Sequence, residues 1–425
     1  MSKLRIIVTG LIAQHPRLGG VTWDYLQYVL GLKRLGHDVH YFEDSGEWPY
    51  NLDGGTNGDQ WVAHDCRPNL EYLSRVMSRY ELADRWAYHF PIKSHWYGIP
   101  DRKRREVIAS ADLLINISGT LEHPEYYRAI PRLIYIDSDP VFTQIKLKLP
   151  EGYEHFQKRV AAHDLWFSFG EHFSDQIPDT DYHWRPTRQP IVLSEWQISQ
   201  PRRDVFTTIM SWTSYKPLVF NNQKFGQKDI EFKRFLDLPA LVGRDVLEVA
   251  LGAIRHANWE IDDVRSPNGM APAVRNRTIS TVDEFLGKAG WCTVDAYQIC
   301  DDLDTYRQYI ESSKAEWSIA KNGYVTGRAG WFSCRSACYL AAGKPVVVQD
   351  TGFSEVLPVG EGILVFQTVE EAAAAIHQVQ FDYQRHSKAA RRIAEEYFDS
   401  DQVLTSLVEQ AYNSDVSNDV EAGFL

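Results

Sequence analysis

The first 44 residues show the pattern of a strand, a glycine loop, a helix and a second strand. A short β-branched run covers Leu4 to Val8, and the stretch from Tyr25 to Leu35 has the apolar spacing of a helix and ends at Gly36. His37 to Phe42 then alternates toward Glu43-Asp44, which completes a βαβ unit. The strands of such a unit lie parallel, and helices must cover the faces of their sheet. We therefore predict an α/β fold built on a parallel sheet.

Two later segments of the first half repeat this pattern. Ala111 to Ile117 leads into Ser118-Gly119, and Pro131 to Ile136 leads into Asp137. Because the carboxyl ends of parallel strands meet at one edge of a sheet, we expect these ends to face one crevice. Residues 45–68 have little periodicity and predict a long excursion over the sheet.

A proline-rich stretch divides the chain into two parts. Its prolines are Pro178, Pro186, Pro190 and Pro201, and a chain of 425 residues is long enough for two domains. We predict a first domain over residues 1–200, a second over 201–395, and a terminal helix over 396–425 positioned to cross back to the first. The elements expected in the second domain are strands at Val205–Met210, Lys344–Val348 and Gly362–Phe366 and helices at Asp245–His256 and Thr305–Glu311.

Composition argues against several classes of partner. Lys and Arg number 45 against 57 Asp and Glu, and the resulting net charge of −12 repels phosphate backbones and anionic lipid. No apolar run reaches the roughly 18 residues of a membrane helix, and Ile6 to Ala13 fits a first strand better than a signal peptide. The five cysteines lack paired CxxC spacing, as expected where thiols stay reduced. We predict a cytoplasmic protein with no nucleic-acid partner and no integral membrane segment.

The stretch from Gly323 to Phe366 carries the strongest chemical signal. Gly327 to Gly330 lets backbone approach a ligand, and Ser333 is a good N-cap for a helix that ends at Gly343. The free amides of such a helix start attract phosphate, and nearby arginines add charge-assisted hydrogen bonds. The loop after the next strand lies where α/β proteins bind ligands. The predicted nucleotide-diphosphate site comprises Arg328, Gly330, Ser333, Arg335, Asp350, Thr351, Gly352, Phe353 and Glu355.

Three segments resemble GT-B glycosyltransferases. AAGKPVVVQDTGFSEVLP (341–358) is similar to the turn, strand and loop that hold the sugar nucleotide in that group. RLGGVTWDYLQYVLGLKRLGHDVHYFED (17–44) resembles the opening Gly-Gly loop, helix and G-H-x-V strand, and HSKAARRIAEEYFDSDQVL (386–404) resembles the terminal helices. In the identity and order of its residues, the segment from Arg335 to Phe366 looks closest to the bacterial spore-maturation-type glycosyltransferase-like group.

This resemblance implies two Rossmann-like doubly wound domains that face a central cleft. It implies transfer of a sugar from a nucleotide-diphosphate sugar, bound by the second domain, to a hydroxyl of a small-molecule or glycan acceptor bound by the first. The diphosphate would be neutralised by the helix start and loop, so that neither a divalent metal nor another cofactor is expected.

One departure from that group leaves alternatives open. Many retaining GT-B enzymes carry a Glu-x7-Glu pair, and alignment on Gly343-Lys344-Pro345 puts Gly330 and Cys338 at its two positions. The anomeric outcome therefore stays open, and so do a GT-B-shaped binding or scaffold protein without catalysis and a sugar-nucleotide epimerase. A nicotinamide-dependent oxidoreductase is disfavoured because G-x-G-x-x-G is absent.

His15 is the candidate general base. It lies in the first strand-helix loop, where inverting GT-B enzymes that use histidine often place this group, and an imidazole suits proton transfer near neutral pH. Asp24 would orient His15 or simply occupy the first turn of the helix, and the second role is favoured.

The remaining candidates follow strand ends. We predict acceptor-side contacts at Gly19, Gly20, Asp137, Asp139 and Glu171. Asp137-Ser-Asp139 also matches the D-x-D motif with which GT-A enzymes hold a divalent cation, but turn capping or acceptor contact is favoured. In the second half, Trp212 and Lys228 follow the first strand and join the predicted donor site.

Overall fold

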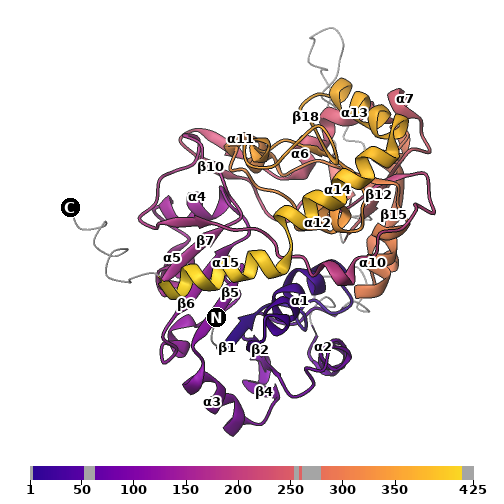
Figure 1. Ribbon diagram of the computed structural model, residues 1–425. Coiled ribbons are helices and arrows are strands. Elements are labelled where there is room, and N and C mark those ends of the chain that lie inside the picture. Colours follow the sequence, from indigo (N-terminus) through magenta and orange to yellow (C-terminus); the bar gives the residue numbers. More distant parts are fainter. Residues whose placement is uncertain (1–2, 52–62, 253–257, 261–278, 414–425) are drawn as a thin grey trace.

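The computed structural model describes residues 3–51, 63–252, 258–260 and 279–413, which form two halves that each carry a parallel sheet (Figure 1). The first sheet has the order β4-β3-β2-β1-β5-β6-β7-β8, and β4 runs antiparallel to β3 at one edge. Its strands are β1 Arg5–Thr9, β2 Asp38–Glu43, β3 Trp86–Phe90, β4 His95–Gly98, β5 Leu113–Ile117, β6 Leu133–Asp137, β7 Leu165–Ser168 and β8 Trp184–Pro186.

The second sheet is parallel throughout and has the order β15-β12-β9-β16-β17-β18. Its strands are β9 Phe206–Met210, β12 Leu247–Leu251, β15 Cys292–Asp295, β16 Ala315–Ser318, β17 Val346–Gln349 and β18 Ile363–Phe366. Two further antiparallel sheets have two strands each: β10 Leu218–Phe220 pairs with β11 Gln223–Phe225, and β13 Asn258–Glu260 pairs with β14 Ile279–Thr281. The predicted class, α/β with two Rossmann-like halves, is confirmed.

Helices pack around both sheets. Those of the first half are α1 Gly19–Arg34, α2 Arg67–Arg79, α3 Asp101–Ser110, α4 Phe142–Lys148 and α5 Glu154–Ala161. Those that follow are α6 Lys228–Phe232, α7 Leu238–Val242, α8 Val282–Lys288, α9 Ala296–Ile299, α10 Leu303–Ser312, α11 Asn322–Gly327, α12 Cys334–Ala341, α13 Val369–Phe381, α14 Tyr383–Tyr397 and α15 Ser400–Asn413. No helix in these described ranges is long and apolar enough to cross a membrane.

The end of the chain returns to the first half. The predicted boundary at residue 200 lies between β8 and β9, and the yellow helix α15 lies over the first half in Figure 1. The Ile191 amide donates to the Phe398 carbonyl at 2.7 Å, and the Ser400 amide donates to the Ile191 carbonyl at 2.9 Å. Gly31 of α1 permits close packing, because a Cβ atom there would lie 2.4 Å from Leu404 Cδ1 of α15.

The prediction of a helix over Asp245–His256 is wrong for the part that the structure describes. Residues Leu247–Leu251 form β12, and all five are buried. This strand pairs with β9 on one side and β15 on the other, so both of its backbone edges and both faces are occupied. Periodicity alone does not separate such a short buried run from a helix, and the pairing partners lie far away in the sequence. Residues 253–257 lie outside the described residues.

Candidate functional site

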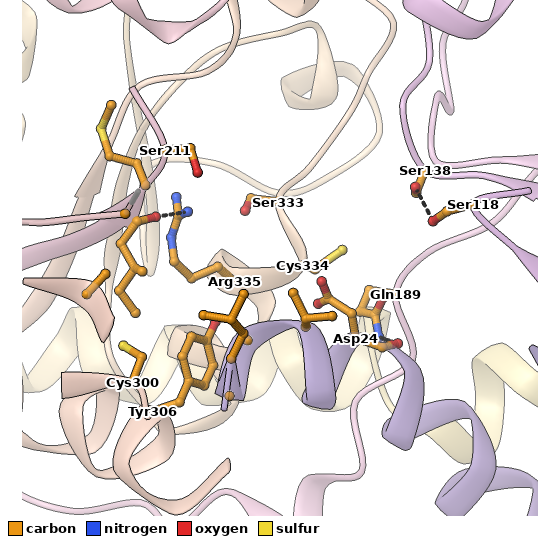
Figure 2. Close-up of a pocket in the computed structure, with 18 of the residues that line it drawn as sticks. Asp24, Ser118, Ser138, Gln189, Ser211, Cys300, Tyr306, Ser333, Cys334 and Arg335 are labelled. Atoms are coloured by element: carbon orange, nitrogen blue, oxygen red, sulfur yellow. Dashed lines mark hydrogen bonds between the residues drawn. The ribbon is translucent and has the colours of Figure 1, made fainter. Parts of the chain in front are cut away.

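A cavity of about 440 Å³ lies between the two halves, a volume typical of small-molecule sites. Residues that follow β5, β6 and β7 line it from the first half, and residues that follow β9 and β12 line it from the second (Figure 2). The starts of α1, α9 and α12 complete the wall. Charged, amide and small hydroxyl side chains in the lining are Asp24, Ser118, Ser138, Gln189, Ser211, Lys228, Lys321, Ser333 and Arg335. The predicted crevice at the carboxyl ends of the strands is therefore present.

The glycine pair at the start of α1 lines this cavity, but packing explains the first glycine. A Cβ atom at Gly19 would lie 2.1 Å from the carbonyl oxygen of Asp302 and 2.5 Å from Cβ of Tyr306. The Gly19 amide also donates to the Cys300 carbonyl at 3.0 Å. A Cβ atom at Gly20 would lie 3.1 Å from the nearest atom of the Tyr306 ring. The predicted acceptor-side pair thus lets α1 approach the segment that leads into α10.

Ser333 and Arg335 stand at the start of α12 and line the cavity, as Figure 2 shows. Ser333 is the N-cap residue by backbone geometry, although its side chain makes no capping hydrogen bond. Arg335 was predicted to bind a diphosphate, yet three of its nitrogens donate within the protein, to Glu316 at 2.6 Å, the Ile209 carbonyl at 2.5 Å and Ser318 at 2.6 Å. Most of its hydrogen-bonding capacity therefore holds α12 against the second sheet.

Lys228 is the cation of the cavity with the fewest protein partners. It is the first residue of α6, and no described carboxylate forms an ion pair with it. Burial holds the pKa of its ammonium well below the ordinary value, and the positive charge of Arg335 lowers it further. A bound anion would oppose both effects, so the predicted donor role of Lys228 fits its surroundings.

The loop predicted to hold the donor is largely occupied by its own hydrogen bonds. Asp350 accepts from the Gly352 amide at 3.0 Å and from the Ser354 hydroxyl at 3.0 Å, and the Thr351 hydroxyl donates to the Trp331 carbonyl at 2.5 Å. The ring of Phe353 is buried and packs at its edge on Phe332. The cavity between the halves is not lined by Arg328, Gly330, Asp350, Thr351, Gly352, Phe353 or Glu355.

This loop instead contacts the first half of the chain. Glu355 lies 3.2 Å from both Arg328 Nη2 and His172 Nε2. Gly330 has a φ of +75°, and a Cβ atom there would lie 2.8 Å from the His172 amide nitrogen. Cys338, at the other position of the missing glutamate pair, is buried against Gln27 of α1 at 3.9 Å. Both positions are therefore points of contact between the halves, where a glutamate side chain would have no room without rearrangement.

The acids predicted to contact the acceptor also form hydrogen bonds or ion pairs within the protein. Asp137, the last residue of β6, is buried and accepts from Thr143, Gln144 and Ser168 of the first half. Asp139 accepts from Lys321 at 2.7 Å and Tyr215 at 2.6 Å, both from the second half. Glu171 forms a two-point ion pair with Arg188, at 2.5 and 2.7 Å. The residue of the D-x-D motif that lines the cavity is the central Ser138.

Two further predicted residues lie outside the cavity wall. The ring of His15 stacks on Tyr50 with 4.6 Å between centroids, and burial lowers its pKa to about 4, which makes it a weak base. Trp212 is buried in the core of the second half and packs on Phe232 and Phe285. A residue just beyond a strand end points either to the cavity or to the core, and the sequence did not distinguish the two for Trp212.

Sequence reasoning missed several cavity residues. Ser118 and Ser138 share a hydrogen bond of 2.6 Å at the ends of β5 and β6. Asp24 faces the start of α12 in Figure 2, and burial raises its pKa to about 7. The Gly19-Gly20 pair could have indicated this position. A helix that begins at Gly19 places Asp24 in its second turn, too far from the first amides to stabilise the helix start, which is the role that the sequence favoured.

No protein-family model and no curated protein matches this chain. Solved structures do. An alpha-glucosyltransferase in complex with UDP and a 13-mer DNA containing a central A:G mismatch is 12% identical with a TM-score of 0.56, and the alignment covers 97% of this chain and 100% of that one. Anabaena Alr3699/HepE in complex with UDP-glucose is 11% identical with a TM-score of 0.53, over 96% and 100% of the two chains.

The chain has the GT-B fold. The match runs over nearly its whole length, so both halves and their arrangement belong to that fold. In it, the cavity described above occupies the cleft between two Rossmann-like halves. At such identities the likeness concerns the fold, and the resemblance to the spore-maturation-type group stays a prediction.

Proposed function

We propose that this protein is a glycosyltransferase, which moves a sugar from a nucleotide-diphosphate sugar to an acceptor hydroxyl without a divalent metal. The observation that carries the proposal is Lys228, a cation without a carboxylate partner among the described residues, which lines the cleft of a GT-B fold. Burial and the nearby Arg335 hold the pKa of this ammonium well below its ordinary value although Glu316 opposes the shift, and a diphosphate in the cleft would add the negative charge that the ammonium lacks in direct contact.

The start of α12 supports the same donor site. Ser333 and Cys334 line the cavity where the first amides of the helix have no partner within it, and such amides favour an anion. As the bond from the sugar to the diphosphate breaks, Lys228 and these amides would stabilise the developing charge. The alpha-glucosyltransferase and HepE structures hold UDP or UDP-glucose, which makes uridine diphosphate the first nucleotide to test.

The opposite wall supports an acceptor rich in hydroxyl groups. Ser118, Ser138 and Gln189 reach the cavity from the first half, and they offer donors and acceptors without net charge. Among the glycosyltransferases, the residues of Arg335–Phe366 support membership of the spore-maturation-type group.

A turnover assay separates this proposal from its alternatives. The full chain is incubated in EDTA with a panel of sugar nucleotides and simple sugar acceptors, and the released nucleoside diphosphate and any glycoside are measured. Release that depends on the acceptor and persists in EDTA is the expected result. Interconversion of sugar nucleotides without release would show an epimerase, and binding without any turnover would show a scaffold; either result contradicts the proposal.

A further inference from the structure

Asp24 lines the cavity, and its carboxylate has no partner among the described residues. It sits in the second turn of α1, five residues after Gly19, so it does not interact with the amides of the helix start. Its backbone carbonyl accepts a hydrogen bond from Gln189 at 3.0 Å, whereas its carboxylate has no hydrogen bond or ion pair with a described residue. Figure 2 shows this carboxylate directed toward Cys334 at the start of α12.

The surroundings of Asp24 offer its carboxylate no structural partner that would offset the free-energy cost of its burial. The titratable groups that face it are Arg335, Cys334 and Cys338 of α12, Tyr25 and Tyr28 of α1, and Tyr306 of α10. Arg335 is the positive group among them, and it is already paired with Glu316. A carboxylate kept in such a place costs stability, and residues that cost stability inside clefts are characteristic of functional sites.

The rest of the cavity wall offers no competing carboxylate or imidazole. Among the described residues that line it, Asp24 is the sole acid and there is no histidine. The cations Lys228 and Arg335 stand on the second half, whereas Asp24 comes from the first. The acid thus lies on the wall where an acceptor would bind, across from the groups suited to a diphosphate.

We propose that Asp24 is the general base of the transfer. This inference rests on the proposed glycosyltransferase function. The acceptor oxygen forms a bond to the anomeric carbon, its proton passes to the Asp24 carboxylate, and the bond from that carbon to the diphosphate oxygen breaks. The electron pair of the broken bond leaves with the diphosphate, whose charge Lys228 meets, so atoms and charge balance without another reactant. Burial raises the pKa of Asp24 to about 7, near the optimum for proton exchange at neutral pH.

The test uses UDP-glucose with water as the acceptor. UDP release is measured from pH 5 to 9 for the full chain and for Asp24→Asn, Asp24→Glu and Asp84→Asn, and UDP binding is measured separately by calorimetry. Asp84 is exposed and serves as the control for loss of one negative charge. We expect the wild-type rate to rise with pH through about 7 as Asp24 ionises, because the carboxylate is the active form.

Asp24→Asn should lower kcat by about 100-fold or more, remove the rise near pH 7 and leave the UDP Kd within about threefold, since a general base contributes roughly 10² to 10⁴. Asp24→Glu should recover part of the rate, and Asp84→Asn should behave as wild type. Unchanged turnover in Asp24→Asn would overturn the inference, as would a loss of UDP binding equal to the loss of rate. A wild type that binds no nucleotide would instead refute the proposed function, and the inference with it.

Discussion

Arg335 and Glu316 form an ion pair in the interior of the second half, with 2.6 Å between Nε and Oε1. Glu316, on β16, is completely buried, and Arg335 also bonds to the Ile209 carbonyl and to Ser318. The pair therefore joins the start of α12 to two strands of the sheet. Arg335 shapes the donor side of the cavity chiefly by fixing this helix.

Arg335→Ala should destabilise the protein by about 3–5 kcal/mol, because it leaves a buried carboxylate without its partner. Arg328→Ala is the matched control: Arg328 is 41% exposed and pairs with the half-exposed Glu355 and, at 3.6 Å, with Asp350, which keeps its hydrogen bonds from Gly352 and Ser354, so the loss should cost about 1 kcal/mol. Urea unfolding of both variants measures the difference. Equal stability of the two variants would show that Arg335 is not a structural link.

Gly330→Ala should destabilise the contact between the halves. Gly330 and Gly360 both have positive φ, at +75° and +99°, but a Cβ atom at Gly360 meets nothing within 4 Å. Gly360→Ala should therefore cost only the roughly 1–2 kcal/mol of backbone strain, and Gly330→Ala should cost about 1 kcal/mol more because of the His172 backbone. Thermal unfolding of the pair tests this, and equal losses would contradict the tight contact.

Asp24→Asn should stabilise the protein while it impairs turnover. The pKa of Asp24 is raised from 3.8 to about 7 by burial, so between these values the unfolded chain is ionised and the folded chain keeps its proton. Stability of the wild type then falls as pH rises from about 4 to about 7. The variant lacks this loss and should be more stable by about 1–3 kcal/mol at pH 7.5, with the gap vanishing near pH 4. Denaturation at several pH values measures the gap, and a gap that is constant with pH would show that Asp24 is not desolvated.

The fold was predictable because its signals are local. The β-branched run before Gly10, the helix closed by Gly36 and the strand before Glu43-Asp44 all specify one βαβ unit within 44 residues. The segment that forms β12 was wrongly predicted as a helix, because both of its partners, β9 and β15, are distant in the sequence. Its strand state is set by that pairing and not by its own pattern.

The site was predictable only in part, because its walls come from both halves. Gly19 faces Asp302 and Tyr306, and Asp139 faces Lys321, in contacts that span more than 180 residues. The loop Asp350–Glu355 has the residue types of a ligand loop, yet it uses them on its own turn and on His172. The sequence indicated only an orienting or helix-start role for Asp24, because its place in the cavity depends on where α1 begins and on what lies opposite, neither of which the sequence displays directly.

Calorimetric titration of the full chain with UDP, with and without EDTA, tests whether the cavity between the halves binds a nucleotide diphosphate without a metal. Lys228→Ala is compared with Lys224→Ala. Lys224 lies four residues earlier in the sequence, and its side chain is exposed. We expect UDP binding that EDTA does not change. It should weaken about 30-fold or more in Lys228→Ala, because a charge contact of about 2 kcal/mol is lost, and Lys224→Ala should leave it intact. Absence of binding, binding abolished by EDTA, or equal affinity in Lys228→Ala and wild type would contradict a metal-independent donor site in this cavity.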